Sequence, residues 1–297
     1  MKKPSGKPAE LLLGAHLSIA GGLHRAIEEA ASMDCGALQI FTKNASTWRE
    51  KTLTEKEIRA FSEMREKTGI RHIAAHTAYL INLASADPVV RQKSRQALKQ
   101  ELIRCGRLEI PWLVLHPGSH MGDGETVGIG RIAEAVNEIF AQLPQNPTRL
   151  LLETTAGQGT ALGKSFDQLA QIIEKISDKS RIGTCLDTCH VFAAGYDISG
   201  SNSYGRTMQD FDRIIGLEKL FLIHVNDAKK PCGSRVDRHA HIGEGMIGIS
   251  GFSALVNDSR LSAVAKILET PKKRNGQNAD PENLALLREL YLSGTAG

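Results

Sequence analysis

The sequence predicts a single (β/α)8 barrel, and two observations carry that prediction. Short apolar runs rich in β-branched residues recur along the chain, and an amphipathic helical segment follows each of them. Strands that alternate with helices in this way are typical of a parallel sheet covered by helices, and eight such units in 297 residues suit a closed barrel. No stretch rich in Pro, Gly or Ser divides the chain. We therefore expect one domain over residues 1–297, with loose termini at 1–9 and 293–297.

Each expected strand is an apolar run that ends in a polar residue, and these runs cover residues 11–16, 37–42, 72–76, 112–116, 149–153, 182–187, 220–226 and 265–270. The expected helices carry apolar residues at helical spacing, and they cover 23–32, 55–67, 88–108, 127–141, 166–176, 208–215, 251–256 and 281–290. We expect residues 272–280 to form an exposed polar loop. An open, doubly wound sheet is the competing arrangement. It is disfavoured because Gly21 and Gly22, after the first run, do not form a Gly-x-Gly-x-x-Gly motif.

Composition excludes several classes of protein. Lys and Arg number 37 against 33 Asp and Glu, so the net charge of +4 is well short of a polybasic chain. The content of 41% apolar and 24% charged residues is that of a globular protein with a sizeable core. No run approaches the roughly 20 apolar residues of a membrane helix, and the start lacks the apolar region of a secretory signal. We expect a soluble cytoplasmic protein with no membrane contact, whose five cysteines are free thiols.

Side chains that can bind metals gather at the ends of the predicted strands. The last residues of the eight runs include His16, Thr42, His76, His116, Glu153, Asp187, His224 and Glu269. In a barrel the carboxyl ends of all strands surround one mouth, so these side chains would converge. A single His or Glu at a strand end is more often structural, and for His16 we favour such a supporting role. The coincidence across seven strands favours a shared site.

Two short motifs add ligand types to this set. Asp187 and His190 stand three residues apart, and Asp237 and His239 stand two apart. Imidazoles and carboxylates without an obligatory thiolate favour Zn²⁺, Mn²⁺ or Fe²⁺ over Mg²⁺ or Ca²⁺. The candidates are too many for one ion, which implies two or three metals; they are His76, His116, Glu153, Asp187, His190, His224, Asp237, His239 and Glu269. Such clusters typically hydrolyse phosphate esters.

The same segments carry a resemblance that spans roughly residues 12–291. They read GAH at 14–16, FTKN at 41–44, HTAYLINL at 76–83, LHPGS at 115–119, LETTAG at 152–157, LDTCH at 186–190, AGYD at 194–197, HVNDAK at 224–229, GSRVDRH at 233–239, HIGEG at 241–245 and LETP at 268–271. In these motifs and their order the chain is similar to endonuclease IV, the family of metal-dependent apurinic/apyrimidinic endonucleases of DNA base-excision repair. The resemblance implies a (β/α)8 barrel.

The resemblance also implies three zinc ions, with Mn²⁺ as an alternative at one position. The implied ligand sets are His76, His116 and Glu153 for the first ion, Glu153, Asp187, His224 and Glu269 for the second, and His190, Asp237 and His239 for the third. The implied reaction is hydrolysis of the phosphodiester on the 5′ side of an abasic site by a hydroxide that bridges two metals, with Glu153 and Glu269 as catalytic residues. Trimming of blocked 3′ ends is a further implied activity, and the implied partner of this monomer is double-stranded DNA.

Recognition of an abasic site must depend on shape, because a missing base presents no edge to read. Tyr79 and Leu80 match the family's intercalating pair, and Lys43, Asn44 and Arg238 are further expected DNA contacts. Lys229, Lys230 and Arg235 are candidates for phosphate contacts. The chain departs from the family at Ser46, where well-known members have an arginine two residues before Trp48. Arg49 is a candidate substitute, although we favour a solvated surface arginine there.

Other interpretations remain open. A sugar isomerase or epimerase on a similar barrel would need one or two metals, which leaves His190, Asp237 and His239 without a role. A module that only binds damaged DNA would not need a complete ligand set. Cys185 and Cys189 are expected to pack in the core rather than to bind metal, and the glycines of residues 243–245 are expected to form a tight loop rather than a phosphate cradle.

Overall fold

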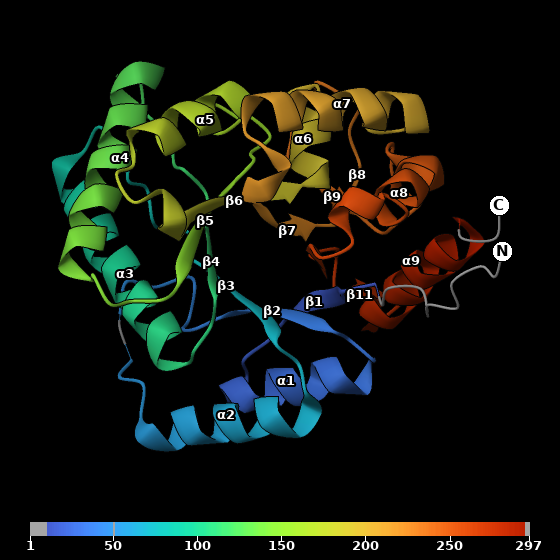
Figure 1. Cartoon of the computed structure of the whole chain (residues 1–297), viewed down its shortest axis with the longest axis horizontal. Coiled ribbons are helices and arrows are strands. Elements are labelled where there is room, and N and C mark those ends of the chain that lie inside the picture. Colours follow the sequence, from blue (N-terminus) through green and yellow to red (C-terminus); the bar gives the residue numbers. More distant parts are fainter. Residues whose placement is uncertain (1–10, 50, 295–297) are drawn as a thin grey trace, which may run out of the picture.

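The computed structural model describes residues 11–49 and 51–294, and its centre is a closed barrel of eight parallel strands (Figure 1). The barrel order is β1-β10-β7-β6-β5-β4-β3-β2, so the last barrel strand pairs with the first. The strand bounds are β1 Leu13–Leu17, β2 Ala37–Phe41, β3 His72–His76, β4 Trp112–Leu115, β5 Arg149–Glu153, β6 Ile182–Asp187, β7 Leu220–His224 and β10 Ala265–Leu268. The predicted barrel is confirmed. Of the termini expected to be loose, residues 1–9 and 295–297 lie outside the described residues, whereas 293 and 294 belong to the last helix.

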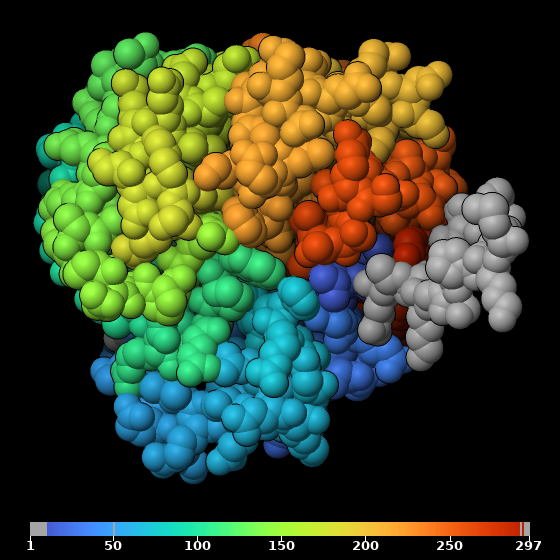
Figure 2. Space-filling model, viewed as in Figure 1, coloured from blue at the N-terminus to red at the C-terminus, as the bar shows by residue number. Residues whose placement is uncertain are grey.

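Helices surround the barrel in chain order (Figure 1), and the space-filling view in Figure 2 shows the same succession of sequence colours over one face of the molecule. They are α1 Leu23–Ser32, α2 Glu55–Thr68, α3 Pro88–Arg107, α4 Glu125–Gln142, α5 Phe166–Lys175, α6 Thr188–Ala194, α7 Ser201–Ile214, α8 Gly248–Val256 and α9 Asp280–Gly294. Within residues 11–49 and 51–294, no helix is long and apolar enough to cross a membrane.

Three of the differences between the structure and the predicted elements have a clear physical reason. Helix α6 was not predicted, because it is short and follows β6 directly, with the Asp187 side chain accepting a hydrogen bond from the His190 amide at its start. Helix α7 begins seven residues before the predicted start, because polar Ser203 and Thr207 face the core there. Residues 272–278 are mostly exposed, as predicted for the loop at 272–280, but the loop includes a small hairpin of β11 (Lys273–Arg274) and β12 (Gln277–Asn278) that was not predicted.

The barrel interior is a thin apolar layer, distinct from the larger apolar layer between strands and helices. Its members are Ala37, Ala74, Val114, Leu151, Cys185, Leu222, Ala265 and Ile267. Because alternate residues of a strand point to the same side, the residue two positions after most of these also points inward, at the mouth. The interior layer therefore fills the barrel beneath one polar cluster.

We predict that Gly14→Ala strongly destabilises the barrel. Gly14 pairs with Ala37 across β1 and β2, and a Cβ at Gly14 would lie 2.0 Å from the Ala37 carbonyl oxygen. Backbone atoms cannot yield cheaply, so we expect the free energy of unfolding to fall by about 3 kcal/mol, measured by urea denaturation. The control is Gly36→Ala, whose Cβ would lie 3.6 Å from a Leu12 methyl group. Equal losses in both variants would contradict this account of β1–β2 packing.

Candidate metal centre

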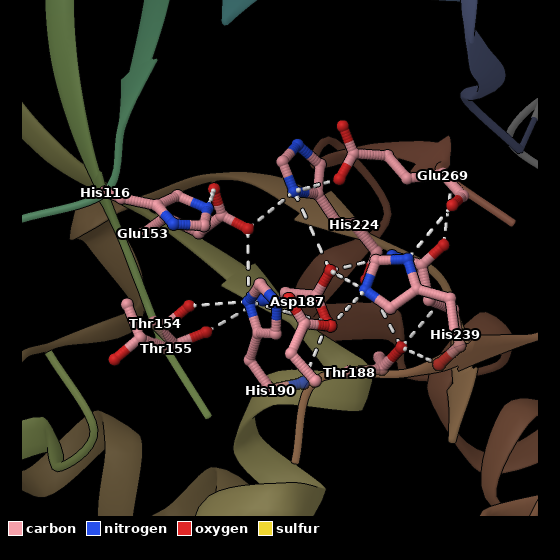
Figure 3. A network of polar contacts seen from close by, with 12 residues as sticks. His116, Glu153, Thr154, Thr155, Asp187, Thr188, His190, His224, His239 and Glu269 are labelled. Atoms are coloured by element: carbon pink, nitrogen blue, oxygen red, sulfur yellow. Dashed lines mark hydrogen bonds and ion pairs between the residues drawn. The ribbon is translucent and has the colours of Figure 1, made fainter. Parts of the chain in front are cut away.

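The structure brings the nine predicted ligands to the carboxyl mouth of the barrel. His76, Glu153, Asp187 and His224 are the last residues of their strands, and His116 and Glu269 follow β4 and β10 by one residue. His190 lies in the first turn of α6. Asp237 and His239 come from the hairpin formed by β8 (Asp227–Ala228) and β9 (His239–Ala240). Figure 3 shows most of these side chains pointing toward one another from their separate elements.

The carboxylate of Glu153 lies at the centre of the cluster and is fully buried. Its Oε2 lies 3.1 Å from Nε2 of His76 and 3.0 Å from Nε2 of His116. Its Oε1 lies 2.9 Å from Nδ1 of His224 and 3.3 Å from Nδ1 of His190. Burial alone would raise the pKa of Glu153, but the charges of His116 and His224 outweigh burial and hold the pKa well below its usual range. One carboxylate thus contacts four imidazoles.

The other candidate ligands form clusters around Glu153. Nδ1 of His224 lies 3.1 Å from Oε2 of Glu269, and ligand atoms of Glu153, Asp187, His224 and Glu269 all lie within 4.8 Å of one another. Asp237 contacts Nε2 of His190 with one oxygen and Nε2 of His239 with the other, both at 3.2 Å. His76, His116 and Glu153 form another group within 4.8 Å. Two of the implied sets are thus such groups, whereas His190 and His239 group with Asp187 and are also joined through the two oxygens of Asp237.

The chemistry of these donors fits divalent cations. Among the residues that the structure describes, the ion pairs of all four carboxylates are with histidines, and none is with Lys or Arg. Nε2 of His239 is buried without a hydrogen-bond partner in that part of the chain, although Asp237 lies near it. The thiol of Cys189 also lies near Asp237 and His239, but burial raises its pKa to about 12. Buried imidazoles and carboxylates without other countercharges are typical of a metal site.

The cluster lies at one wall of a cavity of about 580 Å³. Phe41 and Tyr79 line the same cavity, and their rings meet edge to face with centroids 5.3 Å apart. The Tyr79 residue is 71% exposed, and Leu80 beside it is half-buried. An exposed aromatic ring held beside a polar cluster can stack on a planar or apolar group that enters the cavity.

The other predicted DNA contacts differ in accessibility. Asn44 and Arg238 are exposed. Lys43 is buried, with its ammonium 4.0 Å from Oε1 of Glu101 and 3.4 Å from the Thr47 carbonyl oxygen. In the structure the loop carbonyl and a buried carboxylate hold the charge of Lys43, and its role as a direct DNA contact stays a prediction.

The loop at residues 241–248 is organised by a buried carboxylate. Oxygens of Asp227 accept hydrogen bonds from the amides of Gly243, Gly245 and Ile247 at 2.9–3.0 Å. Because these amides point at Asp227, they do not form an open phosphate cradle, and the expected tight loop is what the structure has.

Comparisons with known proteins agree with this geometry. A family model described as "xylose isomerase-like TIM barrel" matches residues 27–290. A protein of Geotalea daltonii named "probable endonuclease 4" is 49% identical over 278 residues, which cover 94% of this chain and 97% of the relative. The chain belongs to the endonuclease IV family. The crystal structure of endonuclease IV from Thermus thermophilus matches with a TM-score of 0.83 and 34% identity, over 95% of this chain and 99% of that chain.

A more distant likeness concerns the fold alone. A D-tagatose 3-epimerase-like protein matches with a TM-score of 0.71 and 19% identity, over 95% of this chain and 98% of that chain. This chain therefore shares its barrel fold with a protein named as epimerase-like.

Two buried amides hold the ligands of this endonuclease IV family member, and sequence analysis missed both. Oε1 of Gln39 lies 2.8 Å from Nε2 of His224, and its Nε2 donates to Oε1 of Glu269 at 2.7 Å. His16, as expected, is a supporting residue, with Nδ1 2.7 Å from the same Glu269 oxygen. Asn226 donates to Oδ2 of Asp187 at 2.7 Å. The available signal was a polar residue within an apolar strand, since Gln39 follows inward-facing Ala37 by two positions.

We predict that Gln39→Leu weakens binding of divalent metal by about 10- to 100-fold, because His224 and Glu269 lose the group that fixes their orientation. The measurement is divalent metal retained by the purified protein during titration with a chelator. The control is Gln100→Leu on the exposed face of α3. Unchanged metal retention in a folded Gln39→Leu protein would refute the positioning role of Gln39.

Proposed function

We propose that this protein is a DNA-repair endonuclease that hydrolyses the phosphodiester on the 5′ side of an abasic site, leaving a 3′-hydroxyl and a 5′-deoxyribose phosphate. The observation that carries the proposal is the contact of Glu153 with four imidazoles at the mouth of an endonuclease IV family barrel. We further propose a second activity, the removal of blocking groups from 3′ ends at the same site.

We propose three zinc ions as the cofactors. The first would be held by His76, His116 and Glu153, the second by Glu153, Asp187, His224 and Glu269, and the third by His190, Asp237 and His239. When bound, the ions would supply an activated water and would neutralise the charge that develops on the phosphate. Mn²⁺ is an alternative at one position, because imidazole and carboxylate suit both metals.

The side chains perform the positioning. Glu153 is buried among the proposed ligands of the first two ions, so this one carboxylate would help to hold both. Oε1 of Glu269 contacts His16 and Gln39, while Oε2 lies 3.1 Å from Nδ1 of His224. Oε2 would therefore be the Glu269 oxygen that orients the attacking water. Catalysis would then need no acid from the protein, which is consistent with a mouth that holds carboxylates and metal-ligand imidazoles.

Recognition of the lesion would come from the rim of the cavity. An abasic nucleotide leaves its stack at low cost, and an inserted ring can fill the space that the missing base leaves. Tyr79 is exposed beside the centre and Leu80 is next to it, so we propose these two as the inserted pair. Asn44 and Arg238 are proposed backbone contacts on either side, and the monomer would bind double-stranded DNA.

A sugar isomerase or epimerase is the second candidate, which shares the fold. It is disfavoured by Asp237, whose two oxygens contact His190 and His239 in a third cluster that a one- or two-metal isomerase does not need.

The direct test is a duplex with one tetrahydrofuran abasic analogue, which resists β-elimination and so reports hydrolysis alone. We expect the zinc-loaded protein to cut the analogue strand and a chelated sample to leave it whole. Glu153→Gln, which removes a charge at the centre, should lower the rate at least about a hundredfold without unfolding the protein. Glu289→Gln, an exposed change on α9, is the control and should keep the native rate. An uncut analogue at full metal content would overturn the proposed function.

We also expect Tyr79→Ala to weaken binding to the abasic duplex by about 10-fold or more, since stacking on an aromatic ring contributes about 1–3 kcal/mol. Binding to an intact duplex should change little, because no gap is open there. Binding to the abasic and to the intact duplex is measured by fluorescence anisotropy. Each protein also carries Glu153→Gln, so that the abasic duplex is not cut during the measurement. Met246→Ala, another exposed apolar side chain, is the control. Equal losses on both duplexes would make Tyr79 a packing residue rather than a lesion contact.

A further inference from the structure

One buried side chain of the last helix contacts two of the segments that carry candidate metal ligands. Asn283 stands in the first turn of α9 and is only 2% exposed. Its Oδ1 accepts a hydrogen bond from the Ile242 amide at 2.9 Å. Its Nδ2 lies 3.1 Å from Nδ1 of His241 and 3.3 Å from Oγ1 of Thr270, and it donates to the Ala279 carbonyl oxygen at 2.9 Å. The amide can join these groups because it both accepts and donates hydrogen bonds.

The residues that Asn283 contacts adjoin ligands on two different elements. Thr270 directly follows Glu269 after β10, and His241 stands two residues after His239, where β9 ends. Glu269 is a proposed ligand of the second ion, and His239 is a proposed ligand of the third. Nδ1 of His239 also lies 3.0 Å from the Glu269 carbonyl oxygen, so the two segments are in direct contact. Asn283 therefore joins two segments whose ligands belong to different ions.

The first turn of α9 is itself held at the mouth of the barrel. Asp280 is fully buried, and its Oδ2 lies 2.8 Å from Nζ of Lys272, which lines the metal cavity. Glu282 lies 2.6 Å from Nη1 of Arg274, and Nη2 of the same arginine lies 2.5 Å from Glu244. These ion pairs join the helix start to the hairpin after β10 and to the loop after β9. A side chain in this turn therefore extends from a fixed backbone.

An amide at position 283 does more than fill space. Packing alone would be served by an apolar side chain, as at Leu284 and Leu287 of the same helix, which are fully buried. A buried amide costs free energy unless it is hydrogen-bonded, and its hydrogen bonds are directional. Bonds to Ile242 and Thr270 hold two segments at set distances, which apolar contacts do not. Because metals accept a narrow range of ligand distances, a group that fixes both segments affects how tightly metal is held.

We propose that Asn283 is a positioning residue for the metal centre, which sets the spacing between Glu269 and His239. The inference rests on the proposed function, since that function assigns these two side chains to different ions of one reaction site. Asn283 would touch neither metal nor substrate. It would act through Thr270 and through the segment after β9, so that the ligands of the third ion keep their place beside those of the second.

The test uses the whole zinc-loaded protein and two substitutions of different size. Asn283→Leu removes all hydrogen bonds of the amide, whereas Thr270→Val keeps the shape of that side chain and removes its contact with the amide. Titration with a chelator should show that zinc affinity falls about 10- to 100-fold in Asn283→Leu and by a smaller factor in Thr270→Val. The double variant should lose less than the product of the two fold-changes, because both substitutions break the same contact.

Asn257→Leu is the matched control. The Asn257 amide also holds α9, because its Nδ2 donates to the Leu290 carbonyl oxygen at 3.0 Å, about two turns farther along the helix than Asn283. We expect this control to keep native zinc affinity even where the free energy of unfolding falls. In cutting of the tetrahydrofuran duplex, Asn283→Leu should lower kcat about tenfold and keep the native KM, and the control should keep both values.

Native zinc affinity in a folded Asn283→Leu protein would overturn the assignment. Equal losses in Asn257→Leu would also overturn it, because packing of α9 alone would then explain the effect. If Asn283→Leu does not fold, Thr270→Val decides, and native zinc affinity in that variant counts against the assignment. The chelator titration does not depend on cutting. If the native protein holds zinc and leaves the analogue strand whole, the proposed function fails, while the titration still decides the role of Asn283.

Discussion

The alternation of side chains along eight strands of one closed barrel is the constraint on which the site depends. Residues two apart in a strand point to the same side, so each inward residue at the mouth stands above an inward residue of the interior layer. Interior Leu151 stands two positions before Glu153 in β5, and interior Leu222 stands two positions before His224 in β7. The apolar layer closes the barrel beneath the cluster and keeps water from that side. The charged ligands can therefore be buried without a polar channel through the barrel.

Burial of so many ionisable groups demands compensation. A buried carboxylate without a partner is costly, and Glu153 meets that cost through four imidazoles rather than through Arg or Lys. Imidazoles can become neutral and turn to a metal, whereas a guanidinium would remain charged and would compete with the cation. The side-chain amides of Gln39 and Asn226 suit the centre whether or not a metal is bound. They fix the orientation of the His224 ring and the Asp187 carboxylate without adding charge.

The strands and the convergence of the ligands could be predicted because both follow from local patterns. Apolar runs indicated the strands. Because the carboxyl ends of all strands in a barrel surround one mouth, the polar residues at those ends were expected to lie together. Helix α6 could not be predicted, because its six buried residues directly follow a buried strand and show no alternation between a buried and an exposed face. The role of Gln39 depends on contacts with residues 185 and 230 positions away, which no local pattern reveals. The burial of Lys43 could not be predicted for the same reason, since Glu101 of α3 lies far along the chain.

Helix α3 links the two rim segments on which recognition would depend. Oε1 of Glu101 accepts a hydrogen bond from the Ala78 amide at 3.1 Å, beside Tyr79, and it also lies 4.0 Å from the Lys43 ammonium. Arg104, one turn farther along α3, holds the segment that begins at Thr42. The segment that carries the proposed inserted ring and the segment after β2 are therefore fixed to the same helix. Because neither can shift freely relative to the other, a nucleotide that meets Tyr79 would enter the metal cavity in a defined position, and positioning of this kind lowers the entropic part of a reaction barrier.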